Sequence, residues 1–215
     1  MNRRGLILSA LALPLPALGL GACSVLPDRP YQQTQRFILA PERPPGGAGP
    51  RRGPVLLLRT MRAAPGLDQR GLRILGARDE VAVDFWNEWT APPADLVEEA
   101  LRRWLLASGR FGAVTAPGSR QRADLILEGE LTRLQAEPRL GLARASLSAL
   151  LLANGTSGDT RVLGQFLADG TAPLPGGPRS DGKVAAGDAA VAMSAALGDA
   201  LGRLETALAG AIAKR

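Results

Sequence analysis

Histidine is absent from the 215 residues, cysteine occurs only as Cys23, and lysine occurs only as Lys183 and Lys214. Without histidine, neither a Ser-His nor a Cys-His pair is available for nucleophilic catalysis. A zinc site built from thiolates and imidazoles is also excluded, and one cysteine cannot form a disulfide within the chain. The chemistry that remains is that of carboxylates or of a Ser-Lys pair, and both lysines fall where exposed helix ends are expected. We therefore expect no catalytic residues, no metal site, no cofactor and no enzyme activity.

The charges do not indicate a nucleic-acid partner, and the sequence motifs do not indicate nucleotide hydrolysis. Basic residues number 26 against 20 acidic ones, and all but two of the basic residues are arginines. They are scattered, and beyond residue 22 the tight basic pairs outside the predicted helices are Arg51-Arg52 and Lys214-Arg215. Nucleic-acid binding needs a concentrated basic face, so none is expected. Residues 177–183 (GPRSDGK) have the Gly-x-x-x-x-Gly-Lys spacing, but Val184 stands where a phosphate loop requires Ser or Thr, so the complete motif is absent.

The N-terminus has the pattern of a secretory signal that ends in a lipidation site. Arg3 and Arg4 precede an uncharged run over residues 5–22, which closes with Leu-Gly-Ala before Cys23. A charged start, an apolar middle and a small-residue exit are typical of a cleaved export signal. Cysteine at the boundary makes this pattern similar to a bacterial lipobox. We expect cleavage between Ala22 and Cys23, diacylglycerol on the Cys23 sulfur, and a fatty acid such as palmitate on its new amino group.

An uncleaved transmembrane anchor is the alternative interpretation of the same run. Its 18 residues lie near the lower limit for crossing a bilayer. Pro14 and Pro16 interrupt it and cost helix hydrogen bonds, and no basic stop-transfer cluster follows. The lipoprotein interpretation is therefore favoured, while export by the general or by the twin-arginine route stays open.

Beyond the signal peptide (1–22), the sequence predicts a tether over residues 23–35 and one α+β domain over residues 36–215. The domain is expected to hold a mixed, largely antiparallel sheet packed by two main helices. Alternation and apolar runs predict strands, and Gly-Pro-rich stretches at 41–54 and 171–182 predict loops. The expected strands span residues 36–39, 55–60, 72–75, 81–85, 113–115, 124–135, 143–153 and 161–168. Of these, 72–75 with 81–85 and 143–153 with 161–168 are expected to pair as hairpins.

Helical spacing predicts the two helices. The first follows Pro92-Pro93, ends before Gly109, and is expected to pair Glu98 with Arg102 and Glu99 with Arg103. The second, at about 184–213, carries an apolar stripe of Met193, Leu197, Leu201, Leu204, Leu208 and Ile212. Glycines weaken a helix, so those at 198, 202 and 210 suggest close approach to a neighbouring backbone. Gly129 is expected to mark a bulge in the strand over 124–135.

The order of these elements resembles the ABC-type transport auxiliary lipoprotein family, the PqiC-like proteins. The matching stretches follow the lipobox at residues 36–41 (RFILAP), 81–93 (VAVDFWNEWTAPP) and 123–129 (ADLILEG). Together they cover most of residues 36–213, and the specificity of the match comes from their order. A long Gly-Pro run at 44–54 and phenylalanine at positions 37 and 85, where tyrosine is commoner, depart from the family pattern.

The resemblance implies a non-enzymatic component of an MCE-type system that moves phospholipid between membranes. Its partners would be an MCE-domain protein and an inner-membrane ABC transporter, with a permease and an ATPase. The chain would be lipid-anchored in the outer membrane and would face the periplasm, as its docking component. Ser24 fits this location, because aspartate after the lipidated cysteine would favour retention in the inner membrane. Direct phospholipid binding and assembly into a homo-oligomer stay open.

Trp86 and Trp89 are candidate contacts with a partner or with lipid, because tryptophan favours boundaries between apolar and polar surroundings. Packing of the first helix onto the hairpin is the competing interpretation for these residues and for Trp104. Glu128 and Glu130 share one strand face, as two catalytic carboxylates would, but a solvated face explains them equally. Two other functions therefore stay open: an envelope-assembly scaffold for lipopolysaccharide or cell wall, and a hydrolase that uses carboxylates alone.

Overall fold

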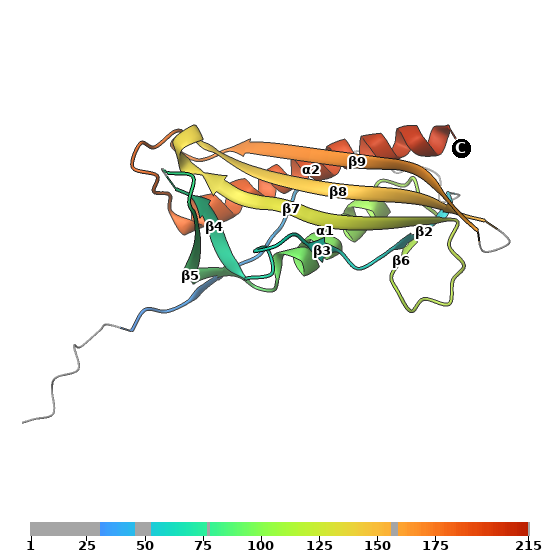
Figure 1. The fold of residues 1–215 in the computed structure, drawn as a ribbon, viewed down its shortest axis with the longest axis horizontal. Helices are drawn as coiled ribbons and strands as arrows, with labels where there is room; N and C mark the ends of the chain where they lie inside the picture. The colour runs from blue at the N-terminus through green and yellow to red at the C-terminus, as the bar shows by residue number, and fades with distance from the viewer. Residues whose placement is uncertain (1–30, 46–52, 77, 156–158, 215) are drawn as a thin grey trace, which may run out of the picture. The chain divides into compact units, whose positions relative to one another are not determined.

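The described residues form nine strands, two long helices and a short 3-10 helix, arranged as one mixed sheet with both long helices on one face (Figure 1). The computed structural model describes residues 31–45, 53–76, 78–155 and 159–214. These elements all belong to the unit Gln33–Arg215, which is separate from Met1–Gln32. The strands are β1 (Gln35–Phe37), β2 (Val55–Leu58), β3 (Arg62–Ala63), β4 (Gly71–Leu75), β5 (Val81–Trp89), β6 (Ala113–Thr115), β7 (Leu125–Glu137), β8 (Leu142–Asn154) and β9 (Thr160–Pro173).

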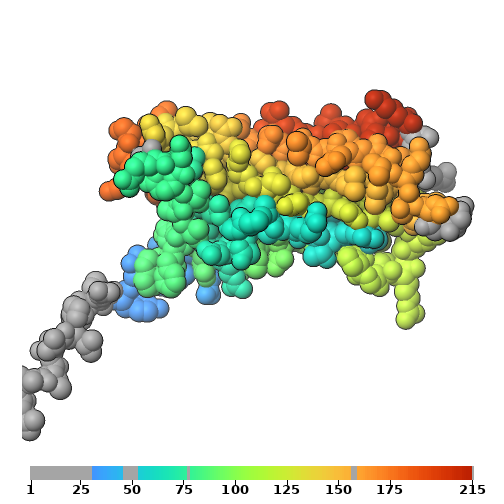
Figure 2. Space-filling model, viewed as in Figure 1, coloured from blue at the N-terminus to red at the C-terminus, as the bar shows by residue number. Residues whose placement is uncertain are grey.

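The longest pairings join β7, β8 and β9 into an antiparallel meander. Alternate residues of β7, among them Leu125, Leu127 and Leu131, are fully buried against the helices. The opposite face of the meander is exposed to solvent, as antiparallel sheets permit, and Leu167 on this face is 79% exposed (Figure 2). The shorter pairings of β1 with β5, and of β2, β3 and β4 with β7, are parallel. The predicted α+β class with a mixed sheet and two main helices is confirmed.

Both predicted hairpins form, β4 with β5 and β8 with β9. The strands are longer than predicted, since β5 continues to Trp89 and β9 continues to Pro173, inside the expected 171–182 loop. The bulge predicted at Gly129 is wrong, because Gly129 pairs in register with Ala149. The register shifts between Leu131 and Arg133 instead. The missing side chain of Gly129 serves another purpose, because a Cβ atom there would lie 2.8 Å from the Cε atom of Met61.

Helix α1 (Pro93–Ala107) begins at the predicted prolines and buries its apolar stripe, including Leu101 and Leu105. The left-handed φ of +67° at Gly109 ends it where expected. Glu99 pairs with Arg103, as predicted, and also with Arg102. The predicted Glu98–Arg102 pair is wrong, because Glu98 Oε2 accepts a hydrogen bond of 2.7 Å from the backbone N–H of Met61. Glu98 thereby holds the residue that precedes β3, and it does not form an ion pair on the surface of the helix.

Helix α2 (Ala186–Ala213) lies along β8 and β9 and buries the predicted stripe, with Ile212 partly buried at its end. The contact is close because both elements present small residues. A Cβ atom on Gly170 of β9 would lie 2.1 Å from the carbonyl oxygen of Ala196 and 2.3 Å from the backbone nitrogen of Ala200. The helix backbone therefore rests directly on the strand backbone at Gly170.

The glycines within α2 play a smaller part than predicted. A Cβ atom on Gly198 would make an ordinary contact of 3.4 Å with the carbonyl oxygen of Glu42, so a neighbouring backbone does approach there. Gly202 faces only the Trp104 ring, and Gly210 faces open space. The prediction of close backbone approach is wrong for these two residues. None of the helices in the described ranges is both long and apolar enough to span a membrane.

We predict that Gly170→Ala lowers the free energy of unfolding by at least about 2 kcal/mol, because its methyl group overlaps the backbone of α2. Gly210→Ala, in the same interface element but facing open space, is the matched control. It should raise the free energy of unfolding by up to about 1 kcal/mol through helix propensity. Denaturant unfolding of the purified full chain measures both. Equal and small effects would show that α2 does not lie on Gly170.

Candidate functional site

A groove of about 1090 Å³ runs along the face of α2 that points away from the sheet. Its floor consists of residues three or four positions apart on the helix: Gly187, Val191, Ala195, Gly198 and Gly202. Val191 is 66% exposed, although it is large and apolar. The opposite wall is formed by Phe37 at the end of β1 and by residues 38–44, the wall segment, from which Ile38 and Ala40 line the groove. The groove is therefore apolar, and small residues keep its floor low.

The wall segment is held on α2 by specific contacts. Leu39 is 4% exposed and belongs to the core. The backbone N–H of Ala40 donates a hydrogen bond of 3.3 Å to Ser194 Oγ. The carbonyl oxygen of Glu42 lies 3.4 Å from the place that a Cβ atom on Gly198 would take, so the segment passes close to the helix there. The segment thus occupies one defined position, so the groove is formed before any ligand binds.

Glu205 is the centre of the polar contacts beneath the groove. Its side chain is buried, and Oε2 accepts a hydrogen bond of 2.8 Å from Trp104 Nε1 of α1. Arg43 Nη2 donates to both carboxylate oxygens at 3.0 and 3.1 Å. Arg110 Nε donates to Oε1 at 3.2 Å, and the Arg43 guanidinium lies 5.8 Å from the Trp104 ring centroid. One carboxylate therefore ties α1, α2 and the wall segment together.

Sequence reasoning did not identify Glu205. A signal was present, because Glu205 adjoins Leu204 and lies three residues before Leu208, within the apolar stripe of α2. An acidic residue at the edge of a buried stripe needs a partner, since an unpaired buried charge is costly. The partners come from positions 43, 104 and 110, which no local pattern connects to it. Trp104 accordingly packs between the two helices, not onto the hairpin.

Three charged groups at the rim of the groove, Asp188, Asp199 and Arg203, are engaged in contacts within the protein. Asp199 accepts hydrogen bonds from Arg203 Nε and from the backbone N–H of Thr171, both at 3.1 Å. Asp188 lies 3.9 Å from Arg179. In the described ranges, no three His, Cys, Asp or Glu side chains come together as a metal site would require. The groove thus offers an apolar binding surface with fixed polar edges.

The two carboxylates weighed as a catalytic pair are both in ion pairs on the solvent face of the sheet. Glu128 Oε1 lies 2.9 Å from Arg59, and Glu130 Oε2 lies 3.5 Å from Arg62. Each carboxylate has its own cation, and both pairs are substantially exposed. This arrangement is that of a solvated face. Lys183 and Lys214 are exposed next to the two ends of α2, as the sequence predicted.

The structure separates the two tryptophans that were candidate contacts. Trp89 is 1% exposed, so it is part of the core and not available at the surface. Trp86 is 37% exposed, and its neighbour Phe85 is 78% exposed. A contact through this region therefore falls to Phe85 and Trp86, and it stays a prediction. Val81 and Val83, expected on one side with Phe85, are also exposed, at 40% and 38%.

Other sequence predictions lie outside the described residues. They are the signal peptide with its cleavage site at Ala22 and Cys23, and the basic pair Arg51-Arg52.

We predict that Glu205→Gln lowers the free energy of unfolding by about 3 kcal/mol, because Arg43 loses the charge that compensates it in a largely buried position. Glu88→Gln is the matched control. Its carboxylate pairs with exposed Arg36 at 2.8 Å, so the loss should stay below about 1 kcal/mol. Thermal or denaturant unfolding compares the two. A loss at Glu205→Gln no larger than at Glu88→Gln would contradict the assigned role.

Comparison with solved structures shows the same fold in other proteins. Protein XCC0632 from Xanthomonas campestris is 21% identical, with a TM-score of 0.66 over 80% of this chain and 92% of that one. A crystal structure of an uncharacterized protein is 12% identical, with a TM-score of 0.58 over 82% of this chain and 99% of that one. No curated protein matches the chain in sequence.

Comparison with protein-family models shows the family to which the sequence belongs. The model for the ABC-type transport auxiliary lipoprotein component matches residues 37–209. This range runs from the last residue of β1 to near the end of α2, and it includes the groove and Glu205. The chain therefore belongs to the ABC-type transport auxiliary lipoprotein family.

Proposed function

We propose that this chain is the auxiliary docking component, on the outer-membrane side, of an MCE- and ABC-type system that transports phospholipid between membranes. In this proposal the signal peptide over 1–22 is removed, Cys23 carries the acyl chains, and residues 23–35 tether the domain over 36–215. Ser24, in place of an aspartate that would favour retention in the inner membrane, is compatible with a position in the outer membrane that faces the periplasm. The observation that carries the proposal is the family match over residues 37–209.

The lipid anchor supplies lasting attachment without a membrane-spanning helix. Each buried methylene group contributes about 0.8 kcal/mol, and more than one acyl chain makes the attachment stable. The domain can then meet the end of a periplasmic assembly without leaving the membrane. ATP hydrolysis belongs to the partner transporter, because Val184 stands where a phosphate loop requires Ser or Thr after its Gly-Lys.

The groove on α2 supports a binding role in lipid transport. Apart from Val191, the residues of its floor have no side-chain atoms beyond Cβ, so the groove stays open. Ile38 and Val191 present exposed apolar surface to it. At its rim, Asp188 pairs with Arg179, and Asp199 accepts hydrogen bonds from Arg203 and Thr171. These two carboxylates therefore do not need a positively charged ligand to compensate them. Such a groove suits an acyl chain, which gains by leaving water and needs no hydrogen bonds. We therefore assign the groove to one acyl chain of the transported phospholipid.

Purification of the full acylated chain from its own envelope tests the partner assignment. An MCE-domain protein, with a permease and an ATPase, should be crosslinked to the chain and identified by mass spectrometry. Cys23→Ala should lose the membrane fraction and these partners together. Reproducible crosslinks to a cell-wall synthase or an outer-membrane barrel, without an MCE protein, would contradict the transport role and favour an envelope scaffold.

We predict that Ala195→Trp lowers labelling of the protein by a photoactivatable phospholipid by about tenfold. A tenfold loss of affinity corresponds to about 1.4 kcal/mol, and each buried methylene group of the acyl chain contributes about 0.8 kcal/mol. The tryptophan side chain therefore needs to displace fewer than two methylene groups from the groove to produce this effect. Ala195 is exposed, so the fold should tolerate the change. Ala213→Trp, exposed at the end of α2 and outside the groove, is the matched control. Equal labelling of both variants would show that the groove does not hold lipid.

A further inference from the structure

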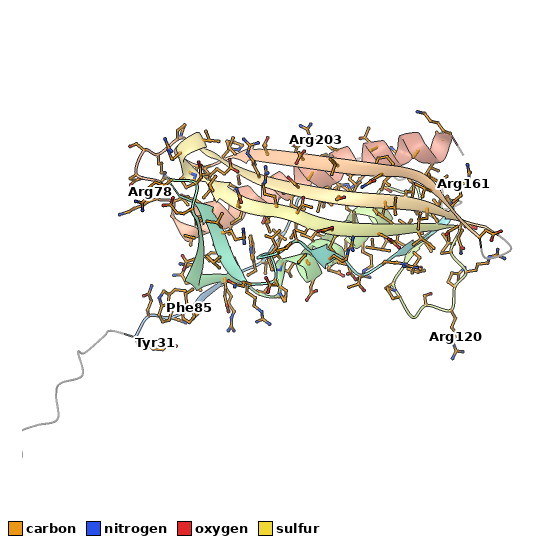
Figure 3. The ribbon with its side chains drawn as sticks, in the orientation of Figure 1. Tyr31, Arg78, Phe85, Arg120, Arg161 and Arg203 are labelled. Atoms are coloured by element: carbon orange, nitrogen blue, oxygen red, sulfur yellow. The ribbon has the colours of Figure 1, made fainter. Side chains whose placement is uncertain are left out.

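Strand β5 carries a bulge that presents two aromatic rings to solvent. Between Gly71 paired with Glu88 and Arg73 paired with Val83, the register shifts, and β5 holds the extra residues. Phe85 and Trp86 lie in this stretch, with their ring centroids 5.1 Å apart and their planes at 86°. Phe85 projects from the end of the β4–β5 hairpin opposite the turn that holds Arg78 (Figure 3). We call residues Asp84–Asn87 the aromatic bulge.

The aromatic bulge is held in place by the side chain of Asp84 and by the facing strand β4. Asp84 Oδ1 accepts hydrogen bonds from the N–H groups of Trp86 and Asn87, at 2.8 and 3.0 Å. Asp84 Oδ2 accepts another, of 2.8 Å, from Asn87 Nδ2. On the facing strand, a Cβ atom on Gly71 would lie 2.4 Å from the carbonyl oxygen of Asp84, so β4 supports the bulge directly. The rings are thus presented in a preorganised position, which lowers the entropy that binding would cost.

The aromatic bulge lies beside the point where the chain enters the domain. β1 is the first strand, and its Gln35 pairs with Asn87 in the bulge. Arg36 Nε donates to Glu88 Oε1 at 2.8 Å, so the Glu88 carboxylate is in an ion pair. The Asp84 carboxylate accepts hydrogen bonds within the bulge. Gln35 is the twelfth residue after Cys23, and an extended chain of that length reaches about 40 Å at most. An anchor at Cys23 therefore keeps the bulge near the bilayer.

We propose that the aromatic bulge inserts Phe85 and Trp86 into the headgroup region of the bilayer that holds the lipid anchor. The inference rests on the proposed function, through the acylated Cys23. Tryptophan and other aromatic rings favour the interface between headgroups and acyl chains. Two rings form too small a patch for a stable protein interface, which buries about 1,200 Å² or more. They suffice for a tethered contact, because the anchor raises their effective concentration at the membrane.

This contact would orient the domain on the bilayer. Phe37 of β1 pairs with Trp89, two residues after the bulge, and Phe37 also lines the groove on α2. With the bulge fixed in the headgroups, this end of the groove would lie close to the membrane surface. An acyl chain would then have a short path between the bilayer and the groove.

Fluorescence quenching by brominated lipid tests the proposal on the full acylated chain. The protein is reconstituted in vesicles of phosphatidylethanolamine and phosphatidylglycerol, with or without bromine on the acyl chains. Trp89 and Trp104 are buried, at 1% and 4% exposure, so Trp86 is the tryptophan that bromine can reach. We expect brominated vesicles to quench the Trp86 emission, and Trp86→Phe to remove the quenched component while the protein still floats with the vesicles. Phe85→Ser should weaken the quenching at Trp86.

A tryptophan elsewhere on the surface is the matched control. Leu167 on β9 is as exposed as Phe85, at 79%, and Trp86→Phe with Leu167→Trp should show no quenching. Vesicle-bound protein whose Trp86 stays unquenched would overturn the proposal but leave the anchor intact. Shielding of Trp86 only as protein concentration rises, from contact with a second copy, would overturn it too. Protein that fails to float with the vesicles would contradict the anchor, and with it the proposed function.

Discussion

The close packing of α2 on β9 is the constraint on which the rest of the domain depends. At Gly170 the backbone of the helix rests on the backbone of the strand, and alanines on both elements keep that contact close. The leucines of α2 fill the core on either side, so the sheet face of the helix is fully used. Its other face is left to line the groove. Glu205 then fixes α1 and the wall segment to the same helix through Trp104, Arg110 and Arg43.

Sequence reasoning predicted the parts of this fold that local periodicity determines. The two helices, the two hairpins and the buried stripe of α2 follow from spacings that a single segment contains. Contacts between distant segments were beyond it. Glu98 was assigned to Arg102, its neighbour on the helix, whereas its partner is the backbone N–H of Met61, 37 residues away. Gly170 shows the same limit, because only the placement of α2 reveals why a side chain is excluded there.

The candidate surfaces were predicted less well for a related reason. Alternation placed Val81, Val83 and Phe85 on one side of a strand, but it could not show whether that side meets the core. β5 lies near the edge of the sheet, and the hydrogen bonds of Asp84 turn Phe85 and Trp86 outward while Trp89 enters the core. The position of the groove could not be predicted, since it needs α2 and the segment after β1 side by side. The resemblance in element order, by contrast, identified the family that the match over residues 37–209 shows.

In the proposed function the domain works by position, with a lipid anchor at its N-terminus, an apolar groove and an aromatic bulge. Mass spectrometry of the mature protein's N-terminal peptide, isolated from its native membrane, tests the lipid anchor most directly. We expect a chain that begins at Cys23, with diacylglycerol on the sulfur and a fatty acid on the amino group. A peptide that still carries residues 1–22, with an unmodified thiol at Cys23, would contradict it.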